Sequence, residues 1–516
     1  MPAFLRPVRL ISWLALVSVV APVALLAQDP PLGSLTFPNS GSAAAQRSFI
    51  RGVLLLHSFE YEDAAKEFQT ARQTDPAFAL AYWGDAMTRT HGLWNEQDSS
   101  AARKILADLG PTPEARAAKA PTARERGYLA AVEALYGPGS KPRRDTLYSR
   151  AMARLVTQFP DDDEAKAFYA LSLMGLSQGV RNVASYVQAG AIALELLERH
   201  PDHPGAAHYV IHAFDDPIHA PLGLRAATAY SRIAPGADHA QHMTTHIFLA
   251  LGMWPEVVAQ NTIAAGADSS RWQAGHYTVW LGYGLTQEGR FRDAHGLLQR
   301  LHVQLPATVT AGRRASLAIL RAHQVINAES WDDPSLAWPI DLTDATVVPR
   351  AIDAFAQGYA GQQRGDVSAA QRGISAIRAL GGSTPRGYGE LPEVPRILAG
   401  MLEAGVLRAG GNQEKAIAML DSLGKVVETL PVDFGPPDLV KPVHELLGAW
   451  LLAAGRAREA EQAFTRALEL APGRLRSLQG LVAAATAAND PEVAGTARRN
   501  LDTLRDVADP GVVAIR

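Results

Sequence analysis

Residues 441–474, KPVHELLGAWLLAAGRAREAEQAFTRALELAPGR, carry the residue pattern from which the architecture of this chain follows. The marker residues are Gly448, Gly455, Ala460, Phe464, Ala467 and Pro472, at positions 8, 15, 20, 24, 27 and 32 of the segment. Small residues let two helices cross closely, and an aromatic ring fills the seam between them. Proline starts or ends a helix without losing a needed donor. The segment therefore predicts a pair of packed helices.

The same pattern occurs near the other end of the chain. Residues 45–78 place Gly52, Ala64, Phe68, Ala71 and Pro76 at positions 8, 20, 24, 27 and 32. Both segments closely resemble the tetratricopeptide repeat, a helix pair of 34 residues. Weaker copies cover 129–162, 170–203, 204–237, 238–271, 275–308, 351–384 and 397–430, and a polar terminal cap follows at 475–508. The resemblance implies an all-α, right-handed superhelical solenoid of about ten antiparallel helix pairs, with a concave and a convex face.

The sequence predicts five parts along the chain. They are a signal peptide at 1–27, a flexible lead-in at 28–44, an N-terminal array at 45–305 that includes His-rich repeats at 204–276, a helix plus insertion at 306–350, and a C-terminal array with its cap at 351–516. The core of the insertion, 328–349 (AESWDDPSLAWPIDLTDATVVP), is acidic and contains two tryptophans. Because it is too long and too apolar for a linker, we expect it to fold over the groove.

The N-terminus has the composition of an export signal. Arg6 and Arg9 precede an uncharged apolar run from Leu10 to Ala27, and polar residues follow. This order predicts a secretory signal that is cleaved after Ala27. The alternative is an uncleaved membrane anchor, because about 18 apolar residues can just span a bilayer. The chain resembles exported bacterial tetratricopeptide-repeat proteins, which implies a periplasmic or secreted location with no stable membrane span after signal removal.

Composition limits the chemistry that the chain can perform. The sequence contains no cysteine, so disulfides, thiolate ligands and thiol nucleophiles are excluded, and any metal site must use histidine and carboxylate ligands. The formal net charge is −3, and basic residues do not cluster. Both observations argue against nucleic acid as the main partner.

Histidines recur at the repeat length. A spacing of 34 residues relates His208, His242 and His276, then His212 and His246, and also His57 and His91. In stacked repeats, a residue type that recurs at the repeat period forms a column in space. The resemblance implies that positions 2, 5, 9, 12 and 13 of each repeat face the concave groove. It therefore assigns to the groove these histidines together with His239 and Asp215, and we add the neighbouring Asp216, Tyr209 and Tyr277 as ligand-contacting candidates.

The columns predict a metal site. His208 and His212 are four residues apart, so both rings project from one face of a helix. Neighbouring helices pack roughly 8–10 Å apart, a gap that facing imidazoles can close. We therefore expect His208, His212, His242 and His246 to surround one ion, with His276 or His239 as a fifth ligand. Asp215, Asp216 or Asp238 would bind the ion directly or orient a ring. Imidazole ligands without sulfur suit Zn, Cu, Fe or Ni.

Three functions remain open from the sequence. The leading hypothesis is an exported solenoid that binds a protein, peptide or small ligand in its concave groove and carries a transition-metal site. A second is a metal-dependent hydrolase or oxidoreductase that uses the histidine site, with Asp215 or Asp216 as general base. A third is a metal-free interaction scaffold in which the histidines only line the groove. A capped pocket over the histidines would favour the enzyme, and an open groove would favour the binding module.

Overall fold

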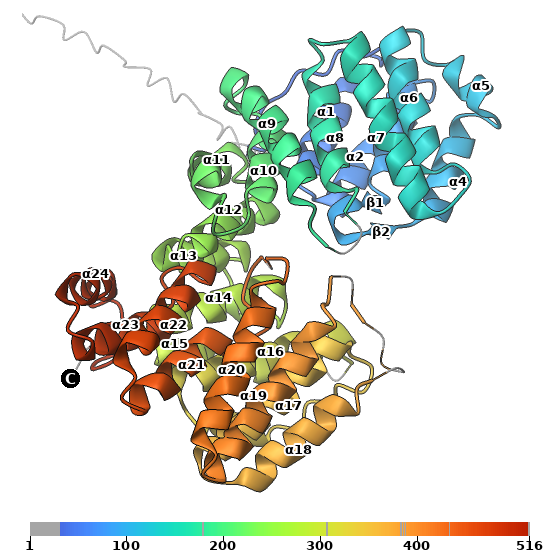
Figure 1. Cartoon of the computed structure of the whole chain (residues 1–516). Helices are drawn as coiled ribbons and strands as arrows, with labels where there is room; N and C mark the ends of the chain where they lie inside the picture. The colour runs from blue at the N-terminus through green and yellow to red at the C-terminus, as the bar shows by residue number, and fades with distance from the viewer. Residues whose placement is uncertain are drawn as a thin grey trace, which may run out of the picture.

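The fold is described from a computed structural model of the chain. It describes residues 31–177, 180–305, 308–381, 384, 386–387, 389–432 and 434–513. The predicted signal peptide at 1–27 lies outside the described residues. Within them, twenty-four α-helices and one two-stranded hairpin make an all-α solenoid (Figure 1).

The helices follow one another as predicted for stacked helix pairs. In the N-terminal part they are α1 (Gln46–His57), α2 (Tyr61–Thr74), α3 (Ala79–Met87), α4 (Ser99–Leu109), α5 (Pro113–Ala117), α6 (Ala123–Leu135), α7 (Lys141–Gln158), α8 (Asp163–Met174), α9 (Val183–Arg199), α10 (Pro204–Ala213), α11 (Ala220–Ile233) and α12 (Asp238–Ala250). A hairpin of β1 (Thr90–His91) and β2 (Glu96–Gln97) follows α3, with the 3-10 turn η1 (Gly92–Trp94) between its strands.

The C-terminal part continues the series. Its helices are α13 (Trp254–Ala264), α14 (His276–Gln287), α15 (Phe291–Val303), α16 (Ala311–Ala328), α17 (Val347–Gln363), α18 (Val367–Arg378), α19 (Glu393–Ala409), α20 (Gln413–Val427), α21 (Val443–Ala453), α22 (Ala457–Leu470), α23 (Leu475–Ala487) and α24 (Pro491–Asp502). Two further 3-10 turns are η2 (Ser269–Arg271) and η3 (Pro334–Ala337).

The marker residues of the quoted segment pack as their chemistry requires. A Cβ atom on Gly448 would lie 2.9 Å from the Phe464 ring, and one on Gly480 only 2.2 Å from it. The Phe464 ring therefore fits between the helices that carry Gly448 and Gly480 because neither residue has a side chain. The first repeat has the same arrangement, in which Gly52 and Gly84 leave room for the Phe68 ring. The sequence prediction of the fold class is confirmed.

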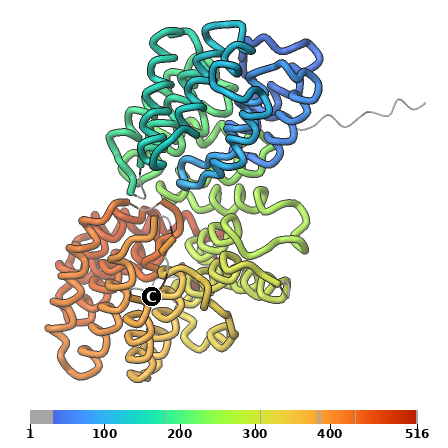
Figure 2. Tube along the Cα trace, turned by 90° about the vertical axis from the view of Figure 1, so that its right-hand side faces the viewer, coloured from blue at the N-terminus to red at the C-terminus, as the bar shows by residue number. Residues whose placement is uncertain are grey.

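The solenoid coils tightly enough to form two lobes (Figures 1 and 2). In the N-terminal lobe, α1 contacts α10, so the first repeat meets the histidine-bearing repeats directly. In the C-terminal lobe, the last repeats fold back toward α13, where Trp254 Nε1 donates a hydrogen bond to the Gly473 carbonyl over 2.8 Å. The helices α12 to α14 therefore lie at the junction of the two lobes.

Two repeat boundaries differ from the prediction. Repeats 204–237 and 238–271 match the helix pairs that begin at α10 and α12. The segment expected at 129–162 instead begins at Ala123, because Thr122 and Glu125 form a capping box that starts α6 earlier. The shift carries through to α8, which begins at Asp163. The local capping signal therefore outweighs the 34-residue count in this part of the chain.

Two connecting segments also differ from expectation. Residues 31–44 are packed rather than flexible, since Phe37 is buried and its ring lies 5.1–5.6 Å from three aromatic rings of the N-terminal lobe. The tryptophan-containing insertion packs against His302 rather than over the predicted metal ligands. Trp338 stacks on His302 with ring centroids 3.9 Å apart, and Arg321 donates to the Ser335 and Trp338 carbonyls. Contacts with α15 and α16 therefore hold the insertion on the C-terminal lobe.

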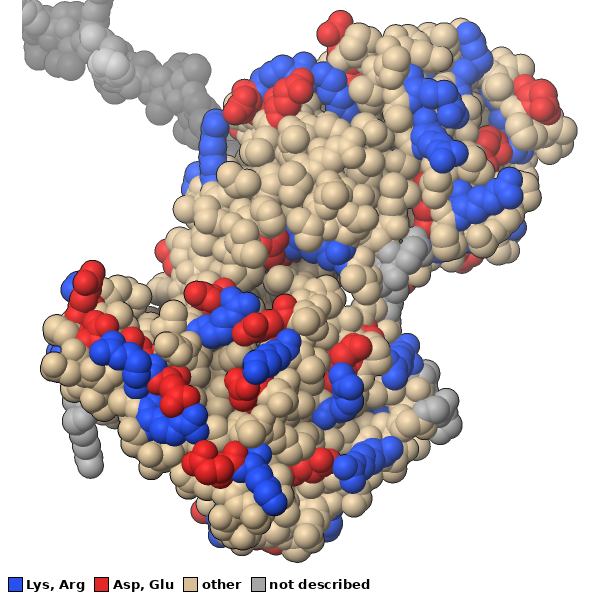
Figure 3. All heavy atoms as spheres, viewed as in Figure 1, with Lys and Arg blue, Asp and Glu red and all other residues tan. Residues whose placement is uncertain are grey.

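Among the described residues, no helix combines the length and the apolar character that crossing a bilayer requires. On the face drawn in Figure 3, positive and negative side chains alternate over the C-terminal lobe, whereas a broad surface of the N-terminal lobe carries few charges. This mixed distribution agrees with the small net charge of −3.

Candidate metal centre

Six histidines from three helices converge at the junction of the lobes. They are His208 and His212 on α10, His239, His242 and His246 on α12, and His276 on α14. Spacings of three and four residues place the histidines of one helix on one face. Because α10 packs against α12 in the stack, these faces meet. The structure thus brings together all five predicted metal ligands and one predicted groove residue, His239.

The six rings divide into two groups of three. The first triad is His208, His212 and His239, and the second triad is His242, His246 and His276. Within each triad, one ligand nitrogen of every ring lies within 4.8 Å of the others. This arrangement differs from the expected single ion between His208, His212, His242 and His246. The stagger of α10 relative to α12 pairs the first two histidines with His239 rather than with His242 and His246.

Hydrogen bonds outside the triads fix the orientation of three rings. His208 donates from Nδ1 to the His57 carbonyl over 2.7 Å, and His246 Nδ1 lies 2.5 Å from a carboxylate oxygen of Asp215. His242 Nδ1 lies 2.7 Å from Asn261 Oδ1, and the amide of Asn261 donates to the Val257 carbonyl. Asn261 is therefore oriented as an acceptor. Each Nδ1 carries the proton, so Nε2 of His208 and of His242 is left with its lone pair toward the centre.

The inward nitrogens of the first triad lack protein partners. In the described part of the chain, Nε2 of His208, His212 and His239 has no hydrogen-bond partner. Nε2 of His242 and Nε2 of His246 face each other at 3.1 Å. A buried polar atom without a partner costs roughly 1–3 kcal/mol. A cluster of such atoms is therefore unfavourable unless a cation uses the lone pairs.

Burial keeps four of the rings neutral. The side chains of the first triad are buried, as are His242 and His246, whereas His276 is exposed at the edge of the centre. Burial lowers the pKa of His208, His212, His239 and His242 well below the usual value of 6.5, and neighbouring imidazoles lower it further. Neutral imidazole is the form that binds a metal ion.

Aromatic side chains enclose the first triad. The Phe59 ring lies 4.3 Å from the His208 ring and 5.6 Å from the His239 ring, centroid to centroid. The backbone of Phe59 is left-handed, with a φ of 57°, which is uncommon for a bulky residue. Hydrogen bonds at the end of α1 hold this conformation, since the Phe59 amide donates to the Leu56 carbonyl. The fold thus places an apolar wall against three imidazoles.

Aromatic side chains of the C-terminal part cover the second triad. Trp280 stacks on His246 with ring centroids 4.3 Å apart, and Phe434 from the segment between α20 and α21 lies 6.0 Å from the same ring. Gly435 approaches Trp280 so closely that an added Cβ would lie 2.7 Å from the indole. Its φ of 112° is also a glycine conformation. A segment of the C-terminal lobe therefore covers a centre built by α10, α12 and α14.

An open pocket reaches the edge of the centre. It has a volume of about 250 Å³ and is lined by His276, Tyr277, Trp272 and two arginines, Arg271 and Arg313. The exposed His276 lines it, so this pocket connects solvent with one ligand of the second triad. The predicted groove residue Tyr277 also contacts His242, with ring centroids 4.8 Å apart.

A third group of candidate ligands is already satisfied by hydrogen bonds. His57 Nε2 lies 2.7 Å and His203 Nε2 3.1 Å from the carboxylate of Glu164. The remaining nitrogens accept hydrogen bonds, one from the Tyr209 hydroxyl and one from the Ala206 amide. Burial acts to raise the pKa of Glu164, but the two histidines outweigh it and lower the pKa to about 2. This buried network positions His57 and leaves neither imidazole a free lone pair for a metal.

The other predicted groove residues occupy different places. His91 lies in β1, stacks on Tyr61 with ring centroids 3.9 Å apart and contacts Glu96, and it belongs to neither triad. Asp215 orients His246, as predicted for a carboxylate outside the ligand set. Asp216 is bound instead to Arg181 and His219. Asp238 is exposed at the start of α12.

Several functional neighbours were not expected from the sequence. Asn261 and Phe59 stand at positions 24 and 15 of their repeats, where the pattern of 441–474 has Phe and Gly, so the repeat does not mark them as groove residues, and Phe434 is about 190 residues from His246 along the chain. The sequence does place His203 directly before Pro204, at the start of a helix of the first column, and Glu164 at the start of an earlier helix. The sequence offered no way to choose them among other polar residues.

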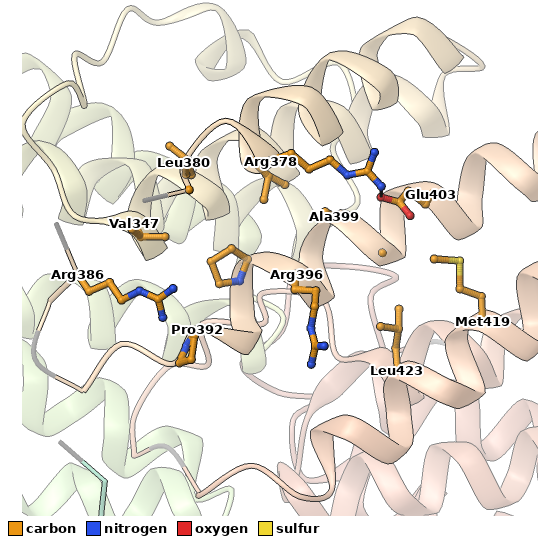
Figure 4. Close-up of a pocket in the computed structure, with 14 residues that line it drawn as sticks. Val347, Arg378, Leu380, Arg386, Pro392, Arg396, Ala399, Glu403, Met419 and Leu423 are labelled. Atoms are coloured by element: carbon orange, nitrogen blue, oxygen red, sulfur yellow. Dashed lines mark hydrogen bonds and ion pairs between the residues drawn. The ribbon is translucent and has the colours of Figure 1, made fainter. Parts of the chain in front are cut away.

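A further pocket lies outside the centre. A pocket of about 390 Å³ between α18, α19 and α20 is lined by Arg386 and Arg396 together with apolar residues such as Pro392 (Figure 4). Arg378 at its upper edge is paired with Glu403 at 2.5 Å. This pocket contains no histidine, so it is separate from the centre.

Comparisons with known proteins add no functional assignment. No model of a known protein family matches the chain, and no curated protein sequence is similar enough to count as a relative. Solved structures are weakly similar. The Cut9–Hcn1 assembly of APC/C shares 11% identity, with a TM-score of 0.33 over 92% of this chain and 76% of that chain. Yeast Tom70 and human IFIT1 each share 13% identity and a TM-score of 0.35 over 88% of this chain, covering 98% and 95% of their own chains.

Proposed function

We propose that this protein binds a transition metal at the histidine centre and that the solenoid serves to enclose it. The observation that carries the proposal is the fixed inward direction of Nε2 on His208 and His242. Each Nδ1 donates to an acceptor outside its triad, at 2.7 Å in both cases. Histidines that bind metals almost always donate their other ring nitrogen in this way, because the bond sets the tautomer and raises the basicity of the ligand.

The donor set narrows the choice of metal. Both triads offer neutral imidazole nitrogens and no carboxylate oxygen or sulfur. Calcium and magnesium prefer oxygen ligands, so they fit poorly. Zinc, copper, iron and nickel all bind imidazole well, and copper(II) is held most tightly by a given nitrogen site.

Metal analysis of the purified protein tests the proposal. The full chain is produced without a histidine tag, stripped with chelator and loaded with Zn, Cu, Fe or Ni separately, and bound metal is measured by mass spectrometry. We expect at least one equivalent of one of these metals in the wild type and loss of metal in a His208→Ala, His246→Ala double variant. His323→Ala is the matched control, because His323 is also buried but lies outside both triads. Absence of metal under all four conditions would leave a metal-free scaffold.

A second candidate function is catalysis by the metal centre, and the enclosure of the histidines favours it. Three protein ligands leave a coordination position for water or substrate, and a bound ion there would supply Lewis-acid or redox chemistry. Asp215 and Asp216, the expected general bases, are occupied by His246 and by Arg181 with His219. An oxidoreductase therefore fits this site better than a hydrolase. Oxygen uptake by the reduced, metal-loaded protein would test it, with the double variant as the control.

The hypothesis that the solenoid binds a peptide or protein concerns the concave groove and not the histidine centre. A peptide or protein partner cannot reach the five buried histidines without opening the centre. Binding of such a partner in the concave groove therefore stays a prediction of the sequence. We also propose export to the periplasm or the medium, which rests on the apolar run from Leu10 to Ala27. Fractionation of cells and N-terminal sequencing of the mature protein would test it.

A further inference from the structure

We propose that the six histidines hold two transition-metal ions, one in each triad, as a dinuclear centre. This inference rests on the proposed function, because it specifies how many ions the centre takes and how they are arranged. A bound ion in either triad would have three imidazole ligands, the number that leaves an open coordination position in catalytic zinc sites.

Each triad is complete as a ligand set. Ligand atoms within 4.8 Å of one another can contact one ion after small rotations of the rings. In the second triad, Nε2 of His242 and Nε2 of His246 are already 3.1 Å apart. Two nitrogens bound tetrahedrally to one ion at about 2.05 Å are about 3.3 Å apart, so this contact has nearly the required geometry.

A single ion would leave half of the centre unsatisfied. An ion in the second triad does not contact Nε2 of His208, His212 or His239, which have no hydrogen-bond partner among the described residues and are buried. An ion in the first triad leaves the nitrogens of His242 and His246 facing each other. Burial excludes the solvent that could hydrogen bond to these atoms instead. Two ions satisfy both halves.

The triads lie beside each other. The His212 and His246 rings are 5.8 Å apart and the His239 and His242 rings are 6.2 Å apart, centroid to centroid. Ring separations within the second triad reach 6.4 Å, between His246 and His276. Because the distances between triads do not exceed those within one triad, ions in both would be neighbours. Ions about 3.5–4 Å apart share one small bridging ligand such as hydroxide in two-metal sites.

The two positions differ in their surroundings. The second triad has the carboxylate of Asp215 behind His246 and opens to solvent at His276. The first triad has only the neutral carbonyl of His57 behind His208 and is closed by Phe59. A carboxylate behind a ligand strengthens it, and the open side admits the ion first. We therefore expect the second triad to fill before the first.

Titration of the metal-free full-length protein with Cu²⁺, followed by electron paramagnetic resonance, tests the proposal. We expect two equivalents to bind. The first should give the signal of an isolated ion, and the second should broaden or remove it, because neighbouring unpaired electrons couple. The wild-type titration alone is decisive, so it does not depend on whether a variant folds.

Paired variants assign the two positions. His208→Ala with His212→Ala should bind one equivalent in the second triad, with an isolated-ion signal. His242→Ala with His246→Ala should bind one equivalent in the first triad and lose the early, tighter phase. His323→Ala should still bind two coupled ions, because the residue lies outside both triads.

The outcomes distinguish the dinuclear centre from metal binding in general. One equivalent in the wild type, lost in both paired variants, would overturn the dinuclear centre and leave a single shared ion, so the proposed function would stand. Two equivalents with uncoupled signals would replace the dinuclear centre by two independent sites. Absence of bound copper, followed by absence of bound Zn, Fe and Ni, would overturn the proposed function itself.

Discussion

Nδ1 of His208 lies 2.7 Å from the carbonyl oxygen of His57, which is 151 residues away in the sequence. This contact joins the end of the first repeat to a helix of the histidine centre. It exists because the solenoid coils until α1 touches α10. His57 in turn is held by Glu164 and Tyr209, so a buried network outside the centre determines which nitrogen of His208 faces inward.

A methyl group on Gly205 should disturb this relationship. An added Cβ would lie 2.4 Å from Nδ1 of His57. We expect Gly205→Ala to lower the free energy of unfolding by about 1–3 kcal/mol, the usual effect of overpacking a core. Metal affinity should fall about tenfold because the support of His208 shifts. Denaturant unfolding and metal titration measure both effects. Gly296→Ala is the matched control, since nothing lies within 4 Å of that Cβ, and an equal loss there would contradict the explanation.

Removal of one ligand should affect stability only through the metal. We expect His242→Ala to lose metal from the second triad, and with it the increase in thermal stability that bound metal gives the wild type. In chelator, the variant and the wild type should melt at similar temperatures, because deletion also removes a nitrogen that faces Nε2 of His246 at 3.1 Å. Differential scanning calorimetry with and without metal measures this. An equal loss in both conditions would mean that His242 is structural.

Asn261 should act as a positioning residue. Its Oδ1 accepts from Nδ1 of His242, and its amide is held by the Val257 carbonyl. We expect Asn261→Leu to lower metal affinity 10–100-fold, because the imidazole loses the acceptor that fixes its tautomer. Asn261→Asp retains an acceptor and should recover most of the affinity. Competition with a chromogenic chelator measures this, and equal affinity in both variants would exclude the positioning role.

His323 should make the C-terminal lobe sensitive to acid. Burial, with a smaller contribution from Arg474, lowers the pKa of His323 from 6.5 to about 3. Between these values the unfolded chain binds a proton that the folded chain does not. The free energy of unfolding is therefore independent of His323 above about pH 6.5. It decreases as the pH falls from there toward 3, with a slope of about 1.4 kcal/mol per pH unit.

His323→Leu tests this dependence. Below pH 6.5, the wild type should lose about 1.4 kcal/mol of unfolding free energy per pH unit relative to the variant, which has no imidazole at this position. Above that pH the difference between the two proteins should be constant. Chemical denaturation of the metal-free proteins at several pH values measures the difference, and a parallel pH dependence of the two proteins would contradict the assignment.

A buried ion pair should stabilise the C-terminal lobe. Arg474 Nε donates to the Glu445 carboxylate at 2.7 Å, and both side chains are almost completely buried. We expect Arg474→Met to lower the free energy of unfolding by about 3–5 kcal/mol, because Glu445 loses its main partner in a desolvated site. Arg458→Met is the control, since that arginine is 61% exposed and its ion pairs contribute little. Equal effects of the two substitutions in urea unfolding would refute this reading.

The repeat pattern predicted the helix pairs well where marker residues occur. The glycine and phenylalanine positions of 45–78 and 441–474 require close helix crossings, and Gly448 with Phe464 makes one. The prediction was less accurate at 129–162, where a capping box set the start of the helix. Such local signals compete with periodicity, because each contributes about 1 kcal/mol to the position of a helix end.

The histidine spacing identified the residues of the centre but not their partners. A period of 34 residues places His208 and His242 in one column of any stack of such repeats. Which rings share an ion depends on the stagger of neighbouring helices, and this grouped His208 with His212 and His239 rather than with His242. Local sequence does not encode that stagger, because it arises from side-chain packing between repeats.

Periodicity and residue type were sufficient for the solenoid and for a histidine cluster, since both follow from contacts between adjacent repeats. The tautomers, the enclosure and the division into triads needed the folded chain. They come from His57 and Phe434, which reach the centre only after small rotations between successive repeats have accumulated into a coil, and from Asn261, which contacts His242 within one helix pair. Contacts between residues so far apart in sequence leave no periodic trace, so only the tertiary structure establishes them.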